Sequence, residues 1–206
     1  MEAELDRWPA ELDRGVAAAA LQGEERSGDR AVFASWDSGA LAAAIDGLGH
    51  GADAALAAEE AAKVVAAHAR EAPETLLQLC HDALVRTRGV VMTLAWFDLA
   101  GSTMTWTGVG NVEGRLMRAG AAPGVAPESA LIKGGVVGYS LPTVRPTTTE
   151  LHNGDTLVMA TDGISSAFAS SLVTGVDAQH LAERILAEHS RGTDDALVVV
   201  VRSTRE

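Results

Sequence analysis

The order in which strand-like and helix-like segments follow one another is the feature that most restricts what this chain can fold into. Strands come first, two helical segments follow, several more strands come next, and one helix and one strand close the chain. Helices are expected at about 51–70, 74–88 and 177–189. Strands are expected at 15–21, 31–36, 40–45, 90–99, 103–109, 114–118, 131–137, 144–151, 156–160 and 196–201.

This order excludes a sheet built from parallel βαβ units, because such units need a helix between successive strands. The segment 103–107 alternates polar and apolar residues, as a half-buried antiparallel strand does. The closing run 196–201, ALVVVV, suits a central strand that is buried on both faces. We therefore predict an α+β fold with antiparallel sheets and helices layered outside them.

Composition limits the classes of partner. With 206 residues, 47% of them hydrophobic, residues 1–206 can form a single domain with a sizeable core. The formal net charge of −12 argues against nucleic acid or an anionic membrane as a partner, although it also serves solubility alone. The charged N-terminus does not resemble a secretory signal, and no apolar run approaches the roughly 18 residues of a membrane span. We expect a cytoplasmic protein, in which the single cysteine, Cys80, fills the core.

Several aspartates share one local context, at the end or start of a predicted strand and beside a glycine or another small residue. They are Asp29 in SGD, Asp46 in DGLG, Asp162 in TDG, and Asp194 with Asp195 in GTDD. The ends of strands from distant parts of a chain can meet at one edge, so we expect these carboxylates to lie close together. Clustered carboxylates raise each other's pKa values unless a cation lies between them.

Divalent cations relieve this repulsion. Mg²⁺ and Mn²⁺ prefer oxygen ligands, and two such ions about 3.5–4 Å apart can hold a phosphate group. Any single Asp-Gly pair is more often a turn, and we assign Asn153-Gly154-Asp155 to a hairpin turn. The joint arrangement of the other aspartates at successive strand ends favours a metal site.

The loop at 47–52, GLGHGA, also fits the G-x-G-x-x-A pattern of dinucleotide-binding loops. That fingerprint needs a second parallel strand soon after the helix, ending in an acidic residue about 20 positions further on. Here the region 64–71 continues as a helix and is followed by Pro73 and a second helix. No Gly-Lys-Ser/Thr sequence follows the loop either, so a nucleotide site is disfavoured.

In order, SGD, DGLGHG, TDG and GTDDALVVVV resemble the motifs of the PP2C (PPM) family of metal-dependent serine/threonine phosphatases. The resemblance extends from Ser27 to Val201. It is greatest to the SpoIIE-like bacterial branch and, within that branch, to RsbX-like stressosome phosphatases, as the short chain and the segment GVGNVEG at 108–114 indicate. It implies an α-β-β-α sandwich of two antiparallel sheets flanked by helix pairs.

The resemblance also implies roles for individual residues. Asp46 would bridge two Mn²⁺ or Mg²⁺ ions, and the Gly47 carbonyl would bind one of them. Asp29 would act near the first ion or through its waters, which makes it the second catalytic residue beside Asp46. The implied metal ligands are Asp29, Asp46, Gly47, Asp162, Asp194 and, ranked below Asp194, Asp195.

The implied reaction is hydrolysis of phosphoserine or phosphothreonine by a hydroxide that bridges the ions, without a covalent intermediate. The implied substrate is a phosphorylated STAS-domain protein of a stressosome or partner-switching pathway. The helices at 51–70 and 74–88 are candidates for a regulatory or docking surface, and outer-layer packing explains most of their residues equally well.

Three positions depart from the pattern of larger relatives. Leu48 stands where they often carry a histidine that is a candidate general acid, and His50 lies two residues further on. Arg26 is displaced from the position of their phosphate-binding arginine. Asn111 stands where they carry an aspartate linked to a third metal. The departures at Leu48 and Asn111 keep one alternative open, a pseudophosphatase that binds phosphoproteins without turnover. A nucleotide-binding regulator is a third possibility, weakened by the missing βαβ unit.

Overall fold

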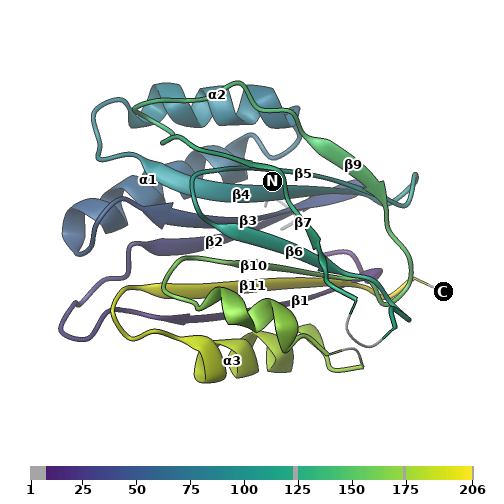
Figure 1. Cartoon of the computed structure of the whole chain (residues 1–206). Coiled ribbons are helices and arrows are strands. Elements are labelled where there is room, and N and C mark those ends of the chain that lie inside the picture. The colour runs from purple at the N-terminus through teal and green to yellow at the C-terminus, as the bar shows by residue number, and fades with distance from the viewer. Residues whose placement is uncertain (1–7, 123–124, 174, 206) are drawn as a thin grey trace, which may run out of the picture.

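The computed structural model describes residues 8–122, 125–173 and 175–205 (Figure 1). The N-terminal stretch that does not resemble a secretory signal begins with residues 1–7, which lie outside the described residues. The elements in chain order are β1 (Leu12–Ala19), β2 (Asp29–Trp36), β3 (Gly39–Gly47), α1 (Ala52–Ala67), α2 (Pro73–Leu84), β4 (Val90–Asp98), β5 (Thr103–Val109), β6 (Glu113–Met117), β7 (Glu128–Ser129), β8 (Ile132–Lys133), β9 (Thr147–Glu150), β10 (Thr156–Ala160), the 3-10 helix η1 (Ser166–Ser170), α3 (Ala178–His189) and β11 (Ala196–Ser203).

Two sheets lie face to face, and helices cover the outer side of each (Figure 1). One sheet has the strand order β1-β11-β10-β6-β7, and α3 covers it together with η1. The other has the order β2-β3-β4-β5-β8, with β9 also paired to β5, and α1 and α2 cover it. The predicted α+β sandwich is confirmed. On the side of α3, the second member of the expected helix pair is the short η1.

Several element bounds differ from the sequence prediction. The strand expected at 131–137 is limited to Ile132–Lys133, which pairs with β5 in the only parallel pairing among the described strands. Gly134 and Gly135 follow it, and Val136 then pairs with Ser140 in a tight turn. The second helix ends at Leu84 rather than 88, because the Leu84 carbonyl accepts hydrogen bonds from both the amide and the hydroxyl of Thr87.

Alternation along the central strands distributes their side chains between two apolar layers. In β11, Leu197, Val199 and Val201 pack between the sheets, whereas Val198 and Val200 pack against α3. This division explains why an unbroken apolar run forms the strand. No helix in the described ranges has both the length and the apolar character needed to cross a membrane.

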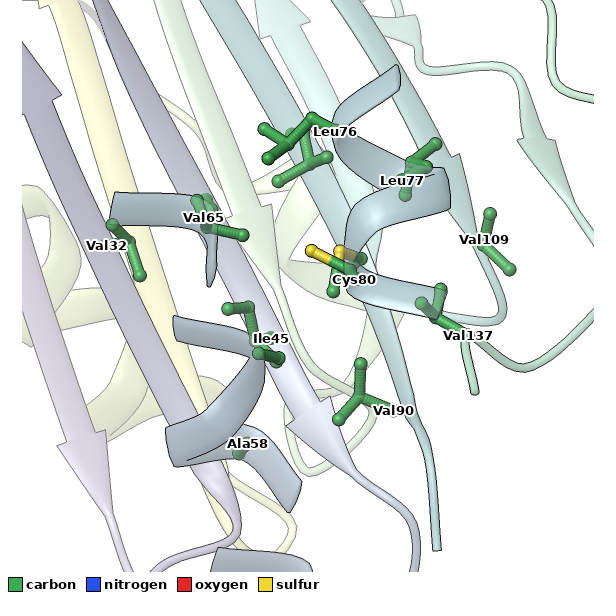
Figure 2. Close-up of a cluster of buried hydrophobic side chains, with 14 of the residues drawn as sticks. Val32, Ile45, Ala58, Val65, Leu76, Leu77, Cys80, Val90, Val109 and Val137 are labelled. Carbon is green, nitrogen blue, oxygen red and sulfur yellow. The ribbon is translucent and has the colours of Figure 1, made fainter. Parts of the chain in front are cut away.

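The layer between the other sheet and its helices is built in the same way (Figure 2). Ile45 of β3 packs there with Val65 of α1 and with Leu76 and Cys80 of α2. Cys80 is fully buried, and burial raises the pKa of its thiol to about 12. The cysteine is therefore a core residue, as expected. This layer fixes α1 over β3, at whose end the candidate site begins.

Candidate metal centre

Asp29 and Asp46 lie side by side at one end of the sheet that contains β2 and β3. Asp29 is the first residue of β2, and the antiparallel register places it directly opposite Asp46 of β3. Directly opposed residues project to the same face with Cβ atoms roughly 5 Å apart. The next pair on that face, Ala31 and Ala44, packs between the two sheets. The register therefore aims both carboxylates into the end of the space between the sheets.

Asp162 and Asp194 approach the same place from the other sheet. Asp162 lies just after β10 and Asp194 just before β11, and these two strands are paired. With Asp46 they line a cavity of about 310 Å³, whose other lining residues are Leu48, Gly49, Val91, Gly110, Asn111, Gly135 and Val136. The structure thus brings together, from both sheets, the acidic residues that the sequence singled out.

Asp29 is buried and Asp46 is half-buried, and their carboxylates repel each other. Burial raises the pKa of Asp46 to about 8, with repulsion from Asp29 as the next cause. Burial also raises the pKa of Asp29 to about 7, although a hydrogen bond from Thr161 acts in the opposite direction. Both shifts favour protonation of the carboxyl groups at neutral pH, and a bound cation would reverse them.

Thr161 is a supporting residue that the sequence reasoning did not identify. Its hydroxyl donates a 2.8 Å hydrogen bond to Oδ2 of Asp29 and accepts a 2.9 Å bond from the amide of Leu197. Both bonds are buried, and they connect β11 to the carboxylate on β2 across the sandwich. The position of Thr161 directly before Asp162, in the motif TDG, was the available signal.

Asp195 differs from the other aspartates in its contacts. One carboxylate oxygen accepts a 2.6 Å hydrogen bond from the amide of Gly28, and the other accepts a 2.8 Å bond from the amide of Leu21. The side chain therefore fixes the backbone immediately before Asp29. Its expected role as a metal ligand, ranked below Asp194, stays a prediction.

The positions that depart from the family pattern have defined partners. Nδ2 of Asn111 donates a 2.8 Å hydrogen bond to Oδ2 of Asp162. Nδ1 of His50 lies 2.7 Å from Glu24, and His50 does not line the cavity. Leu48 packs partly against the core between the sheets. Arg26 forms an ion pair with Glu59, which gives it a structural partner away from the cavity.

The donor set suits a hard divalent cation. Within the described ranges, no three histidine, cysteine or acidic side chains form a ready-made cluster of ligands. Mg²⁺ does not require one, because it typically keeps several waters and binds through one or two carboxylates. A Cβ atom on Gly47 would lie 2.2 Å from the carbonyl oxygen of Ala54, so only glycine allows α1 to pack this closely beside Asp46. The carboxylates at this site thus fit Mg²⁺ or Mn²⁺.

Comparison with known proteins agrees with this geometry. The family described as Stage II sporulation protein E (SpoIIE) matches residues 37–204. The chain belongs to the SpoIIE family. No curated protein sequence matches it.

Solved structures share the fold of this SpoIIE-family chain. One is 28% identical to this chain, with a TM-score of 0.84 over 93% of this chain and 99% of the other. It comes from work that describes the bacterial stressosome as a modular system adapted to control secondary messenger signalling. RsbX in complex with magnesium is 18% identical, with a TM-score of 0.81 and coverage of 96% and 98%. The phosphatase PstP with 2 manganese ions is 15% identical, with a TM-score of 0.68 and coverage of 94% and 99%. The expected PP2C-type fold is confirmed.

Proposed function

We propose that this SpoIIE-family chain is a metal-dependent protein phosphatase that hydrolyses phosphoserine or phosphothreonine on a regulatory protein. The observation that carries the proposal is the convergence of aspartates from both sheets, the buried Asp29 and half-buried Asp46 from one and Asp162 and Asp194 from the other. The magnesium and manganese named with the structures of RsbX and PstP support the choice of ions.

Two divalent ions bound here would neutralise charge on the phosphoryl oxygens and lower the pKa of a bound water. Asp46 would be a ligand of the ions, and the hydrogen bond from Thr161 orients Asp29 and favours its ionised form. Asn111 orients Asp162 without adding a negative charge to the cavity. These residues hold and orient the oxygen donors, so the chain supplies a preorganised site for phosphoryl transfer to water.

The leaving serine or threonine oxygen must gain a proton when its bond to phosphorus breaks. Leu48 cannot donate one, and His50 lies outside the cavity lining beside Glu24. Water is therefore the proton source that we propose. No side chain is needed as a covalent nucleophile, since the oxygen of water itself forms the new bond to phosphorus.

We propose a phosphorylated STAS-domain protein of a stressosome or partner-switching system as the substrate. The naming of the stressosome and of RsbX among the structures that share the fold supports this choice. A dephosphorylation screen of phosphorylated STAS-domain proteins, with wild-type enzyme and Mn²⁺, is the assay for this part of the proposal.

Turnover of para-nitrophenyl phosphate tests the phosphatase proposal itself. We expect activity with Mn²⁺, none with EDTA, and a loss for Asp46→Asn that exceeds the roughly 10–100-fold typical of losing an outer-shell partner. Equal rates under the three conditions would contradict the proposal. Mn²⁺ binding without turnover of any phosphoprotein would instead favour the pseudophosphatase, for which the departures at Leu48 and Asn111 are the argument.

A further inference from the structure

The wall of the cavity continues outward into a short, exposed rim. The backbone of Val90 forms two hydrogen bonds with Val137, of 3.0 and 2.9 Å, so the segment 136–139 lies beside the start of β4. Gly135 and Val136 line the cavity from the inside. We call the residues just outside this wall, Val85, Arg88 and Tyr139, the docking rim.

Tyr139 is the most exposed large hydrophobic residue in the described ranges, with 84% of its surface accessible. Its backbone lies in a tight turn, because the amides of Tyr139 and Ser140 both donate hydrogen bonds to the Val136 carbonyl. The amide of the preceding Gly138 donates to Nδ1 of His81 on α2. Val85, at the end of α2, is 62% exposed. The rim thus offers an exposed aromatic ring on an ordered turn and an exposed aliphatic side chain to a partner.

Arg88 gives the rim a positive charge. A Cβ atom placed on Gly49, a residue of the cavity lining, would lie 2.9 Å from Nη1 of Arg88. Nη2 of Arg88 donates a 2.9 Å hydrogen bond to Asp53, while Nη1 makes no hydrogen bond within the described ranges. Asp53 therefore orients the guanidinium and leaves one nitrogen able to bind an anion. Among the described residues, no lysine or arginine lines the cavity itself.

We infer that the docking rim binds the polypeptide next to the phosphorylated residue of a protein substrate. This inference rests on the proposed function, because it assumes that the phosphoryl group enters the adjacent cavity. A cavity of about 310 Å³ holds a phosphorylated side chain and little more, so the flanking chain must lie across its edge. An apolar substrate residue packs on Tyr139 and Val85, and an acidic one binds Nη1 of Arg88. Substrate selection therefore comes from the rim and hydrolysis from the cavity.

The test compares three substrates under the same Mn²⁺ conditions. The first is a set of phosphoserine peptides with leucine and glutamate at varied positions on both sides of the phosphoserine. The second is the same set with serine at those positions, and the third is para-nitrophenyl phosphate. The variants are Tyr139→Ser and Arg88→Gln. The matched controls are Val16→Ser on β1 and Lys63→Gln on the exposed face of α1, both away from the rim.

We expect each rim variant to lower kcat/KM for the leucine-glutamate set by roughly tenfold, as the loss of about 1.4 kcal/mol of binding does. The other two substrates should stay within about twofold, and the control variants should match wild type on all three. A wild-type enzyme that does not prefer the leucine-glutamate set, or rim variants that slow all three substrates equally, would overturn the inference.

Failure of the proposed hydrolysis can be told apart from failure of docking. If wild type turns over none of the substrates, binding of the fluorescently labelled peptide sets is measured by anisotropy. Weaker binding by Tyr139→Ser and Arg88→Gln, but not by the controls, would support the docking rim in a chain that does not hydrolyse. Unchanged binding by both rim variants would overturn it.

Discussion

The change Asp46→Asn should stabilise the ion-free protein at alkaline pH, although it removes the central residue of the proposed metal centre. Burial and the neighbouring Asp29 raise the pKa of Asp46 from 3.8 to about 8. Between these two values the folded state binds more protons than the unfolded state. The free energy of unfolding of the ion-free wild type therefore falls as the pH rises from about 4 to 8.

The magnitude follows from the pKa shift. Four pKa units correspond to roughly 6 kcal/mol at about 1.4 kcal/mol per unit. Asparagine removes the charge but leaves a buried amide whose hydrogen bonds are incomplete, which costs about 1–3 kcal/mol. At pH 9 we therefore expect the ion-free variant to be about 3–5 kcal/mol more stable than wild type, and at pH 5 to be about equal or slightly less stable.

Urea unfolding in the presence of a chelator, at pH 5 and pH 9, measures this difference. Asp82→Asn, on an exposed part of α2, is the control and should change the free energy of unfolding by less than about 0.5 kcal/mol at either pH. Added Mn²⁺ should reverse the order at pH 9, because it binds the folded wild type more tightly than the folded variant. A difference between Asp46→Asn and wild type that does not change with pH would refute the reasoning.

Two further substitutions test the supports of the site. Thr161→Val removes the hydroxyl that bonds Asp29, so it should raise the pKa of Asp29 further and lower the free energy of unfolding by about 2–4 kcal/mol, whereas Thr161→Ser should keep most of that stability. Urea unfolding measures the stability and Mn²⁺ calorimetry the effect on the site. A valine variant with unchanged stability would contradict the role of Thr161. Gly47→Ala should lower the free energy of unfolding by several kcal/mol, because its Cβ would overlap the Ala54 carbonyl. The control Gly134→Ala, with open space around it, should lower it by under about 1 kcal/mol. Equal shifts of the thermal midpoint for the two variants would disprove the close packing.

Much of the fold could be predicted from local pattern. Strands such as β5 and β10 match the predicted ranges, because alternation or continuous apolarity reports burial directly. The strand expected at 131–137 was mostly wrong. Its apolar residues Val136 and Val137 are placed by a tight turn and by pairing with Val90, which are contacts between distant segments that a local pattern does not encode.

The candidate site divides in the same way. Strand ends beside glycine identified Asp29, Asp46 and Asp162, since these positions follow from the elements themselves. The support from Thr161 depends on the packing of one sheet on the other, and the bonds from Asp195 to backbone amides depend on the path of the β1–β2 loop. The place of Thr161 beside Asp162 could have drawn attention to it, but no spacing in the sequence reveals either set of contacts.

Calorimetric and electron paramagnetic resonance titration of the ion-free protein with Mn²⁺ tests the central claim most directly. The claim is that the aspartates at this end of the sandwich form a centre for two divalent ions. It predicts two bound Mn²⁺ ions per chain for wild type, with exchange-coupled signals, and loss of at least one ion for Asp46→Asn and for Asp162→Asn. Absence of bound Mn²⁺ in the wild type, or binding that both substitutions leave unchanged, would contradict it.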